Sequence, residues 1–526
     1  MNANDERTRS LWVSDVELAP QARRLAEDLT CDVVVVGSGI AGLSVAYELS
    51  QIDKSVVVLD RGSIGGGVTS RTTAHLAPVC DDGVAALAKM RGEEMAAKFQ
   101  ASQAAAVDRI EAIVARHKIN CYFRRLDAYL FPAPGMEFTD AREQQDEEYK
   151  ALRTAKVDVA KAKGVKLKGY EDAPVLHYKN QATFHPLKYL AGLIKQIEAE
   201  GGRLFASSPV IGVEEREHDV RVKLEGGMTF TAGHAVFATN SPTCDWVEIH
   251  SKMAPYRTYA MAFSLPRGVL PDALYWDMGD PYHYVRIQPG RGSTDYLIAG
   301  GGDHKSGEAD DGSVRFEAIE AWIRELVPNL GREVTRWSGQ VLDTIDYCGF
   351  IGRDPSRKRT FIATGDSGQG MTHGALAGML LKNLVIYGAG EWSDVYEPSR
   401  KPVSAVVNFI KENVTAIKNF AEYLMPGEID SADALKRGEG GIMRDGASKI
   451  AVCRDSDGAL HARSAVCTHL GCHVHWNSTE QCWDCPCHGS QFAPNGDVLS
   501  GPAISPLAEA KIPGGARANA DEMNKV

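Results

Sequence analysis

The sequence predicts a mixed α/β fold: a doubly wound parallel-sheet domain, an interleaved antiparallel sheet, and a small all-β domain near the C-terminal end. Three observations support it. Two short β-branched runs within residues 31–60 flank a glycine-rich turn and a helical pattern, which is the βαβ arrangement. Helical and strand patterns then alternate as far as residue 424. From residue 442 the chain has only short strand-like segments separated by turns.

Composition narrows the class of protein. The chain has 526 residues, of which 44% are hydrophobic, and a net charge of −11. At roughly 150 residues per domain, two or three domains are expected. The negative charge argues against a nucleic-acid partner and against binding to an anionic membrane. The first thirty residues lack the apolar core of a secretory signal, and no window approaches the ~18 apolar residues of a membrane span. A cytoplasmic location is therefore expected.

The first turn reads Gly37-Ser38-Gly39-Ile40-Ala41-Gly42. It follows a buried strand and opens a helix, which is the context that a Rossmann-type dinucleotide fingerprint requires. Asp60 ends the next strand, where an acid bonds the ribose hydroxyls of the nucleotide. The motif by itself leaves FAD and NAD open.

The remaining elements are read from periodicity. Helices are expected over 84–118, 140–164, 186–200, 313–330 and 404–424, and strands within 203–239 and 255–301. Residues 361–388 read as a strand, a glycine turn and a long helix. The stretch 425–441 is rich in glycine and charge, which marks a linker.

Five of the eleven cysteines lie between positions 467 and 487, and such clusters usually hold a metal. Cys482 and Cys485 could supply half of a zinc ribbon. The other half does not fit, because four residues separate Cys467 from Cys472. The two boxes CTHLGC and CPCHGS, each combining cysteine with histidine, instead resemble a Rieske [2Fe–2S] centre.

This resemblance implies roles for individual residues. Cys467 and Cys485 would be the thiolate ligands, His469 and His488 the imidazole ligands, and Cys472 and Cys487 a disulfide between the two cluster loops. Leu470 follows the first histidine, where Rieske oxygenases have an arginine, so the pattern is that of an electron-transfer centre. Ser490 matches a serine that donates a hydrogen bond to a bridging sulfide.

Three dispersed stretches, 62–78, 344–355 and 363–378, resemble the FAD-contacting motifs of the D-amino-acid oxidase/glycine oxidase family, and their order is that of the family. The resemblance implies FAD as the cofactor. His75 lines up with a histidine that is bonded covalently to the flavin in some members, whereas others bind FAD without any bond. The FAD-binding residues predicted from the glycine motif and the resemblance are Gly37, Ser38, Gly39, Ile40, Ala41, Gly42, Asp60, Arg61, Thr69, Ser70, Arg71, Thr72, Thr73, Ala74, His75, Val210, Gly365, Gly368, Gly370, Met371 and Thr372.

These motifs predict the domain organisation. An N-terminal extension (1–29) precedes an FAD-dependent oxidoreductase domain (30–400). A connecting helix and linker (401–441), a Rieske domain (442–514) and a tail (515–526) follow. Within 30–400, the FAD-binding parts are expected at about 30–90, 180–245 and 335–395, and the substrate parts at about 91–179 and 246–334.

No second glycine motif follows a later strand, so electrons are expected to come from a substrate rather than from NAD(P)H. The leading hypothesis is a dehydrogenase that oxidises an amine or amino-acid-like substrate by hydride transfer to FAD. Electrons would leave singly through the Rieske cluster to a carrier such as a ferredoxin or a cytochrome. The predicted catalytic residues are Tyr256, Arg257, His283 and Arg286, with Tyr284 and His304 as further candidates for substrate contact. Two alternatives remain: a reductase fed by ferredoxin through the cluster, and a redox relay or sensor without its own substrate.

Overall fold

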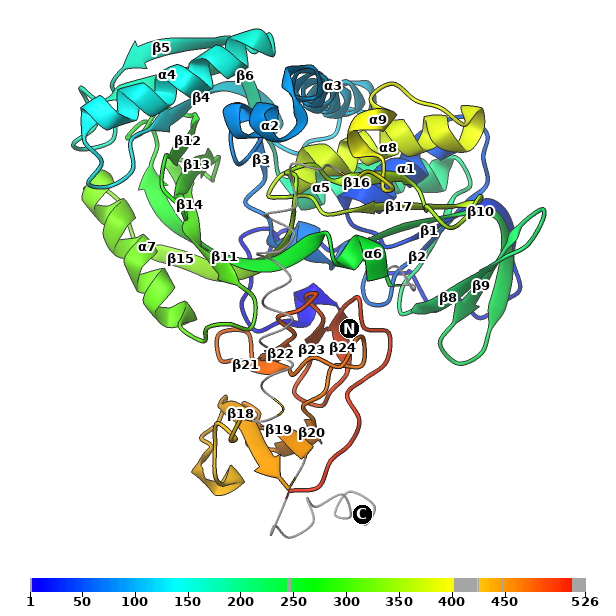
Figure 1. Cartoon of the computed structure of the whole chain (residues 1–526). Coiled ribbons are helices and arrows are strands. Elements are labelled where there is room, and N and C mark those ends of the chain that lie inside the picture. Colours follow the sequence, from blue (N-terminus) through cyan, green and yellow to red (C-terminus); the bar gives the residue numbers. More distant parts are fainter. Residues whose placement is uncertain (1, 244–246, 402–422, 424, 447, 513–526) are drawn as a thin grey trace.

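The computed structural model describes residues 2–243, 247–401, 423, 425–446 and 448–512 (Figure 1). Most of the predicted helix over 404–424 and the whole predicted tail over 515–526 lie outside the described residues. Two large sheets lie side by side, and a smaller lobe built from the C-terminal strands lies below them in the view of Figure 1.

The first sheet contains the predicted βαβ unit. Its central strands are parallel and run in the order β17–β10–β1–β2–β7, with β16 antiparallel at one edge and the hairpin β8–β9 attached to β10. The bounds are β1 Thr30–Val36, β2 Val56–Leu59, β7 Arg203–Phe205, β8 Val210–Glu215, β9 Val220–Leu224, β10 Thr229–Asn240, β16 Phe350–Arg353 and β17 Thr360–Thr364. Residues 33–36 and 56–59 are all apolar because β1 and β2 are buried on both faces.

The second sheet has nine strands in the order β15–β11–β14–β13–β12–β4–β6–β3, with β5 on β6. Most pairs are antiparallel, as predicted, but β12 and β4 are parallel, so the sheet is mixed. The bounds are β3 His75–Leu76, β4 Arg124–Phe131, β5 Val159–Lys163, β6 Pro174–Thr183, β11 Met253–Pro266, β12 Leu274–Asp277, β13 Tyr284–Gln288, β14 Thr294–Lys305 and β15 Glu333–Thr344.

Helices cover both sheets. On the first sheet α1 (Ile40–Ser50) packs against α8 (Gly370–Tyr387) and α5 (Pro186–Ala199), and α7 (Gly312–Leu326) packs on β11 and β14 of the second. The other helices are α2 (Val84–Arg91), α3 (Glu93–His117), α4 (Phe138–Thr154), α6 (Val247–His250) and α9 (Ser393–Tyr396). None of the helices in the described ranges is long and apolar enough to cross a membrane.

The predicted helix over 140–164 is wrong in its second half. The helix α4 ends at Thr154, and residues 159–163 form the strand β5. Alanine and lysine favour a helix here, but pairing of β5 with β6 overrides that preference. Four of the five residues of β5 are exposed, as is common for an edge strand.

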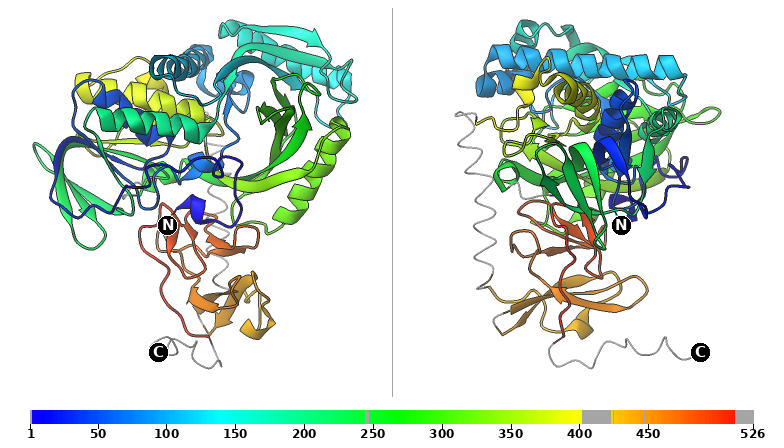
Figure 2. Two further views of the ribbon diagram at one scale, coloured as in Figure 1. Left: turned by 180° about the vertical axis from the view of Figure 1, so that it is seen from behind. Right: turned by 90° about the vertical axis from the view of Figure 1, so that its right-hand side faces the viewer.

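The C-terminal lobe consists of two small antiparallel sheets (Figure 2). One contains β18 (Gly440–Asp445), β19 (Ser448–Arg454) and β20 (Leu460–Ser464), and the other contains β21 (His475–Asn477), β22 (Cys482–Asp484), β23 (Gln491–Phe492) and β24 (Val498–Ser500). The second of these sheets lies nearer to the rest of the chain, next to the N-terminal segment. The short helical turn η1 (Ala3–Asp5) contacts both β24 and the turn η2 (Val68–Arg71).

Candidate active site and electron-transfer centre

A cavity of about 990 Å³ lies between the two large sheets. This is the upper end of the ~300–1,000 Å³ that small-molecule and cofactor pockets have. Its wall includes the glycine turn after β1, strands β11, β14 and β15 of the second sheet, and residues 499–501 of the C-terminal lobe. Three parts of the chain that are far apart in sequence therefore share one cavity.

The glycine turn has the close packing that its sequence predicts. Gly37 has φ +101°, and a Cβ atom there would lie 2.4 Å from the carbonyl oxygen of Ala238. A Cβ atom on Gly42 would lie 1.9 Å from the carbonyl oxygen of Gly37. Only glycine fits at either position, because a side chain on Gly37 would collide with the backbone of β10 and one on Gly42 would push α1 away from the turn.

Most of the residues predicted to bind FAD line this cavity. The exceptions are Gly42, Ser70 and Ala74. Gly42 packs inside the turn, while Ser70 and Ala74 are buried in the adjoining loop. Asp60 accepts hydrogen bonds at 2.9 Å from the backbone N–H groups of both Ser38 and Gly62, which fixes its carboxylate beside the turn.

The cavity wall fits a large polar cofactor. Gly39, at the N-terminal end of α1, places no side chain over the first helical turn, so the positive end of the helix dipole faces the cavity. Polar atoms in the wall are buried without a hydrogen-bond partner among the described residues: Asn240 Nδ2, Thr243 Oγ1 and Gln340 Oε1. Such atoms cost free energy unless a ligand satisfies them.

The structure places one of the four predicted catalytic residues in the cavity wall. Tyr256 lines the cavity, but Arg257, His283 and Arg286 do not. On β11 successive side chains point to opposite faces, so Tyr256 and Thr258 face the cavity and Arg257 points away. His283 bonds to Asp277 at 2.9 Å and stacks on Trp322.

Arg286 supports the wall instead of lining it. Its guanidinium is fully buried and donates to the carbonyl oxygens of Thr73, Ala74 and Phe184 at 2.8–3.2 Å. It therefore holds the loop that presents His75 to the cavity. His75 Nε2 is buried and unpaired within the described residues, and the covalent link to the flavin stays a prediction.

Sequence reasoning missed Asp303. It lies on β14 beside the candidate His304, but Asp303 lines the cavity, whereas His304 bonds to Tyr259 outside it. Burial raises the pKa of Asp303 to about 7, and Oδ1 has no hydrogen-bond partner in the described part of the chain. Tyr284, a predicted candidate, lines the same wall and bonds to Thr258 at 3.0 Å. The alternation of β14 is the signal that separates Asp303 from His304.

The two cysteine–histidine boxes form matching loops in the C-terminal lobe. The backbone N–H of Gly471 bonds to the carbonyl oxygen of Cys467 at 3.1 Å, and that of Gly489 to the carbonyl oxygen of Cys485 at 3.0 Å. Both glycines have positive φ, +83° and +79°, which closes each loop tightly. The loops bring the imidazole rings of His469 and His488 to a centroid distance of 5.0 Å.

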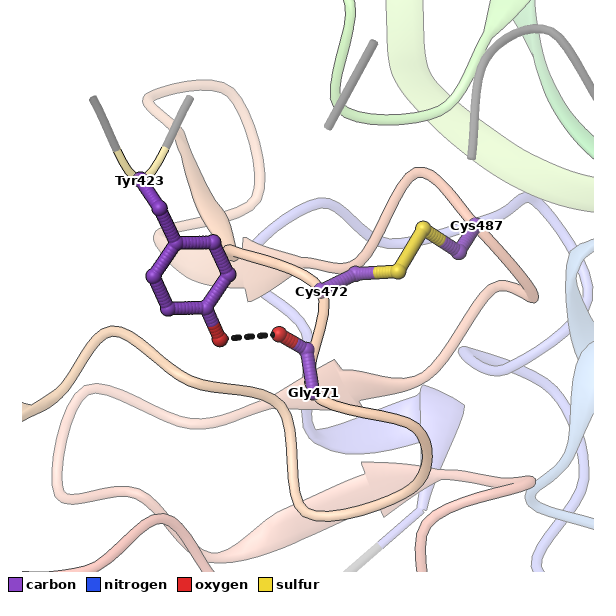
Figure 3. Close-up of a disulfide and its surroundings, with 4 residues drawn as sticks. All are labelled: Tyr423, Gly471, Cys472 and Cys487. Atoms are coloured by element: carbon purple, nitrogen blue, oxygen red, sulfur yellow. Dashed lines mark hydrogen bonds between the residues drawn. A yellow bond between two sulfur atoms is a disulfide. The ribbon is translucent and has the colours of Figure 1, made fainter. Parts of the chain in front are cut away.

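Cys472 and Cys487 form a disulfide that joins these loops, as the resemblance implied (Figure 3). Both cysteines are buried. On the Cys472 side, the hydroxyl of Tyr423 donates to the carbonyl oxygen of Gly471 at 2.6 Å. The bridge therefore holds the two loops at a fixed separation.

These loops fit a cluster with two protein ligands per iron. The Cys467 thiol interacts directly with that of Cys485, which lowers the pKa of Cys467. Burial lowers the pKa of both His469 and His488 to about 4, so the rings are neutral and able to bind a metal. His488 Nδ1 is buried without a partner in the described residues. Nowhere in the described ranges do three His, Cys, Asp or Glu side chains converge as for a single metal ion.

Arg257 belongs to a buried ionic network at the junction of the lobes. It pairs with Asp484 at 3.2 Å and with Glu6 at 3.5 Å, while Arg71 pairs with Glu6 at 3.0 Å and with Glu480 at 2.7 Å. The side chains of all five groups are at most 3% exposed. The network joins the N-terminal segment, the cavity loop, the second sheet and the C-terminal lobe.

Comparisons with known proteins identify two families in the chain, one for each part that contains a candidate site. The family model for FAD dependent oxidoreductases (DAO) matches residues 32–384, and the model for Rieske [2Fe-2S] domains matches residues 427–511. The Bacillus subtilis (strain 168) protein YhfW, named as a Rieske 2Fe-2S iron-sulfur protein, is 30% identical over 96% of this chain and 98% of its own length. The gamma-glutamylputrescine oxidoreductase of Escherichia coli (strain K12) is 24% identical over 72% of this chain and 89% of its own.

Solved structures show the same fold for the first part of the chain. The L-proline dehydrogenase of P. horikoshii superimposes with a TM-score of 0.58 at 17% identity, over 71% of this chain and 98% of its own. The glycine oxidase of Geobacillus kaustophilus gives a TM-score of 0.55 at 19% identity, over 68% and 94%. The chain thus belongs to the DAO family of FAD-dependent oxidoreductases and carries a C-terminal Rieske domain, which together imply FAD and a Rieske-type [2Fe–2S] cluster as its cofactors.

Proposed function

We propose that this protein is an amine dehydrogenase that oxidises a C–N bond by hydride transfer to FAD and releases the electrons singly through its Rieske cluster. One observation carries the proposal: Leu499, Ser500 and Gly501 of the Rieske lobe line the same cavity as the glycine turn of the FAD fold. The Rieske lobe therefore contributes part of the wall of the predicted FAD cavity within one chain. FAD, when bound, supplies both hydride acceptance and one-electron release.

The cavity suits an amine better than an amino acid. Arg257 and Arg286, the arginines predicted to clamp a substrate carboxylate, both lie outside the cavity. Arg61 and Arg71 do line it, but Arg61 donates to the carbonyl oxygen of Val498 at 3.2 Å, and Arg71 is ion-paired with Glu6 and Glu480. The second sheet instead contributes a carboxylate, Asp303, and the phenol of Tyr284 to the wall. A carboxylate attracts a protonated amine and repels a substrate carboxylate.

Asp303 would prepare the substrate for reaction. Hydride leaves the carbon readily only when the neighbouring nitrogen is neutral and its lone pair is free. Because burial raises the pKa of Asp303 to about 7, its carboxylate is a stronger base than an exposed one and can take the proton of a bound ammonium group.

An external carrier could then collect electrons from the cluster. Leu470, next to the cluster ligand His469, is 40% exposed. An exposed apolar residue at this position offers a contact for a small one-electron protein such as a ferredoxin or a cytochrome.

An anaerobic screen tests the proposal. The holoenzyme is mixed with primary, secondary and polyamines, and with amino acids of matched length, while absorbance and the EPR signal of the cluster are followed. The expected result is that an amine bleaches the flavin and then reduces the cluster, whereas amino acids of the same length act more slowly. Flavin reduction only by reduced ferredoxin, with no response to any amine, would overturn the proposal in favour of a reductase.

A further inference from the structure

A third imidazole packs against both predicted histidine ligands of the cluster. His250, at the end of α6 just before β11, is 2% exposed. Its ring centroid lies 4.7 Å from that of His469 at an interplanar angle of 88°, and 5.8 Å from that of His488 at 54°. His250 comes from the FAD-dependent part of the chain, so the ligand rings face the junction between the lobes.

The hydrogen bonding of His250 fixes which nitrogen is available. Nε2 lies 2.9 Å from the carbonyl oxygen of Pro242, and a carbonyl only accepts, so Nε2 carries the hydrogen. In the neutral ring Nδ1 then holds a lone pair. Nδ1 is buried and has no hydrogen-bond partner among the described residues.

The cluster ligands supply the matching donor. A histidine that binds iron through one ring nitrogen keeps an N–H on the other, and such groups nearly always find an acceptor. In His488 the unpaired buried nitrogen is Nδ1, which leaves Nε2 as the N–H donor once the cluster is bound. An unused acceptor and two ligand rings thus meet in one buried contact.

The other side of His250 leads to the cavity. Pro242, which accepts its hydrogen bond, is followed by Thr243, and Thr243 lines the cavity. Thr243 also packs near Gly501 of the Rieske lobe, where an added Cβ would lie 2.9 Å from its methyl group. One hydrogen bond and one peptide unit therefore separate His250 from the cavity wall.

We infer that His250 is a positioning residue for the cluster: its Nδ1 accepts the N–H of a ligand histidine, sets the cluster potential, and provides the route between the cluster and the flavin cavity. Only the route rests on the proposed function. The hydrogen bond draws the proton away from the ligand ring, which makes that ring a stronger electron donor to iron. It therefore stabilises the oxidised cluster.

The test is an EPR-monitored redox titration of the holoenzyme with a chemical reductant and no substrate. His250→Leu should raise the midpoint potential and shift the g-values, because the acceptor is gone. His250→Asn should move both back toward wild type, because its amide oxygen can accept. His218→Leu is the control, since the His218 side chain is 82% exposed, and it should leave both unchanged.

An unchanged midpoint and spectrum in an iron-replete His250→Leu protein would overturn the inference. If that variant does not retain iron, the crystal structure of the loaded wild type decides: Nδ1 of His250 must lie within hydrogen-bond distance, about 3.2 Å or less, of a ligand ring nitrogen. The titration uses no substrate, so the midpoint potential and g-values can be measured even if the protein does not oxidise amines. A shifted potential with unchanged electron transfer from amine-reduced flavin would overturn the route alone.

Discussion

Asp303 and His304 are neighbours in the sequence, but only Asp303 reaches the cavity. The distinction follows from the two-residue period of a strand. The same alternation separates Tyr256, which lines the cavity, from Arg257, which is buried at the junction. Chemical type alone favoured the arginine and the histidine. Orientation on the strand selects the tyrosine and the aspartate.

Asp303→Asn should lower kcat/KM for an amine by roughly 10²–10⁴-fold, the usual contribution of a general base. The base must be ionised, and burial raises its pKa to about 7, so wild-type kcat/KM should rise with pH through that value. The Asp303→Asn variant should lose this rise of kcat/KM with pH. A pH profile of anaerobic flavin reduction measures both effects. If kcat/KM of the variant rises with pH as in the wild type, another group acts as the base.

Ser490→Ala should lower the midpoint potential of the cluster. The Ser490 hydroxyl bonds to the thiol of Cys467, a predicted cluster ligand, and hydrogen bonds to sulfur stabilise the more negative, reduced cluster. EPR-monitored titration gives the midpoint. Ser456→Ala is a suitable control, because Ser456 bonds to Gln481 at an exposed site of the same lobe. A higher or unchanged midpoint in Ser490→Ala would contradict the assigned hydrogen bond.

At the scale of elements, the two cluster loops depend on each other. Each loop is closed by its own glycine, but only the Cys472–Cys487 disulfide joins them covalently, over a sequence separation of 15 residues. The loop-entropy model gives a bridge of this length about 3 kcal/mol of stabilisation.

Replacing both Cys472 and Cys487 by alanine should therefore reduce the iron and labile sulfide retained by the purified protein, while its FAD content stays at the wild-type level. Metal analysis and the visible spectrum measure the two cofactors separately. Cys453→Ala serves as the control, because Cys453 is a buried free cysteine of the same lobe. Equal iron content in the double variant and this control would show that the loops hold the cluster without the bridge.

At the scale of the whole molecule, the position of the Rieske lobe depends on the buried network of Glu6, Arg71, Arg257, Glu480 and Asp484. Burial raises the pKa of Glu480, but Arg71 and Arg257 more than offset this, and the net result is a pKa of about 2. A depressed carboxyl pKa means that the pairing of Glu480 stabilises the fold above its unfolded pKa. That contribution is lost as the pH falls toward 2.

Arg257→Met should destabilise the protein by about 3–5 kcal/mol, because it leaves buried carboxylates without one of their two cations. It should also slow electron transfer from flavin to cluster more than it slows flavin reduction. Thermal unfolding and stopped-flow absorbance measure these two effects. Arg267→Met, which removes a pair with Asp295 in which the arginine side chain is 51% exposed, should cost only about 0–1 kcal/mol. Similar losses in both variants would contradict a special role for the junction.

The sequence by itself determined the local chemistry of this protein. The glycine turn after β1 and the two cysteine–histidine loops are short segments. Neighbouring residues specify the backbone conformation of each, so nucleotide binding and cluster binding could be predicted without a structure. The disulfide partners were implied by the resemblance of the two boxes to a Rieske centre, and the structure pairs the same two cysteines.

Only the tertiary structure decided which residues from distant segments meet. Asp303 and Tyr256 reach the cavity, His250 covers the cluster histidines, and Arg257 lies in the junction because of strand orientation and lobe packing. The strand β5 also formed against its local helical preference, since pairing with β6 outweighs propensity. These outcomes depend on contacts between residues far apart in the chain. A local sequence pattern does not identify which distant residues it will contact.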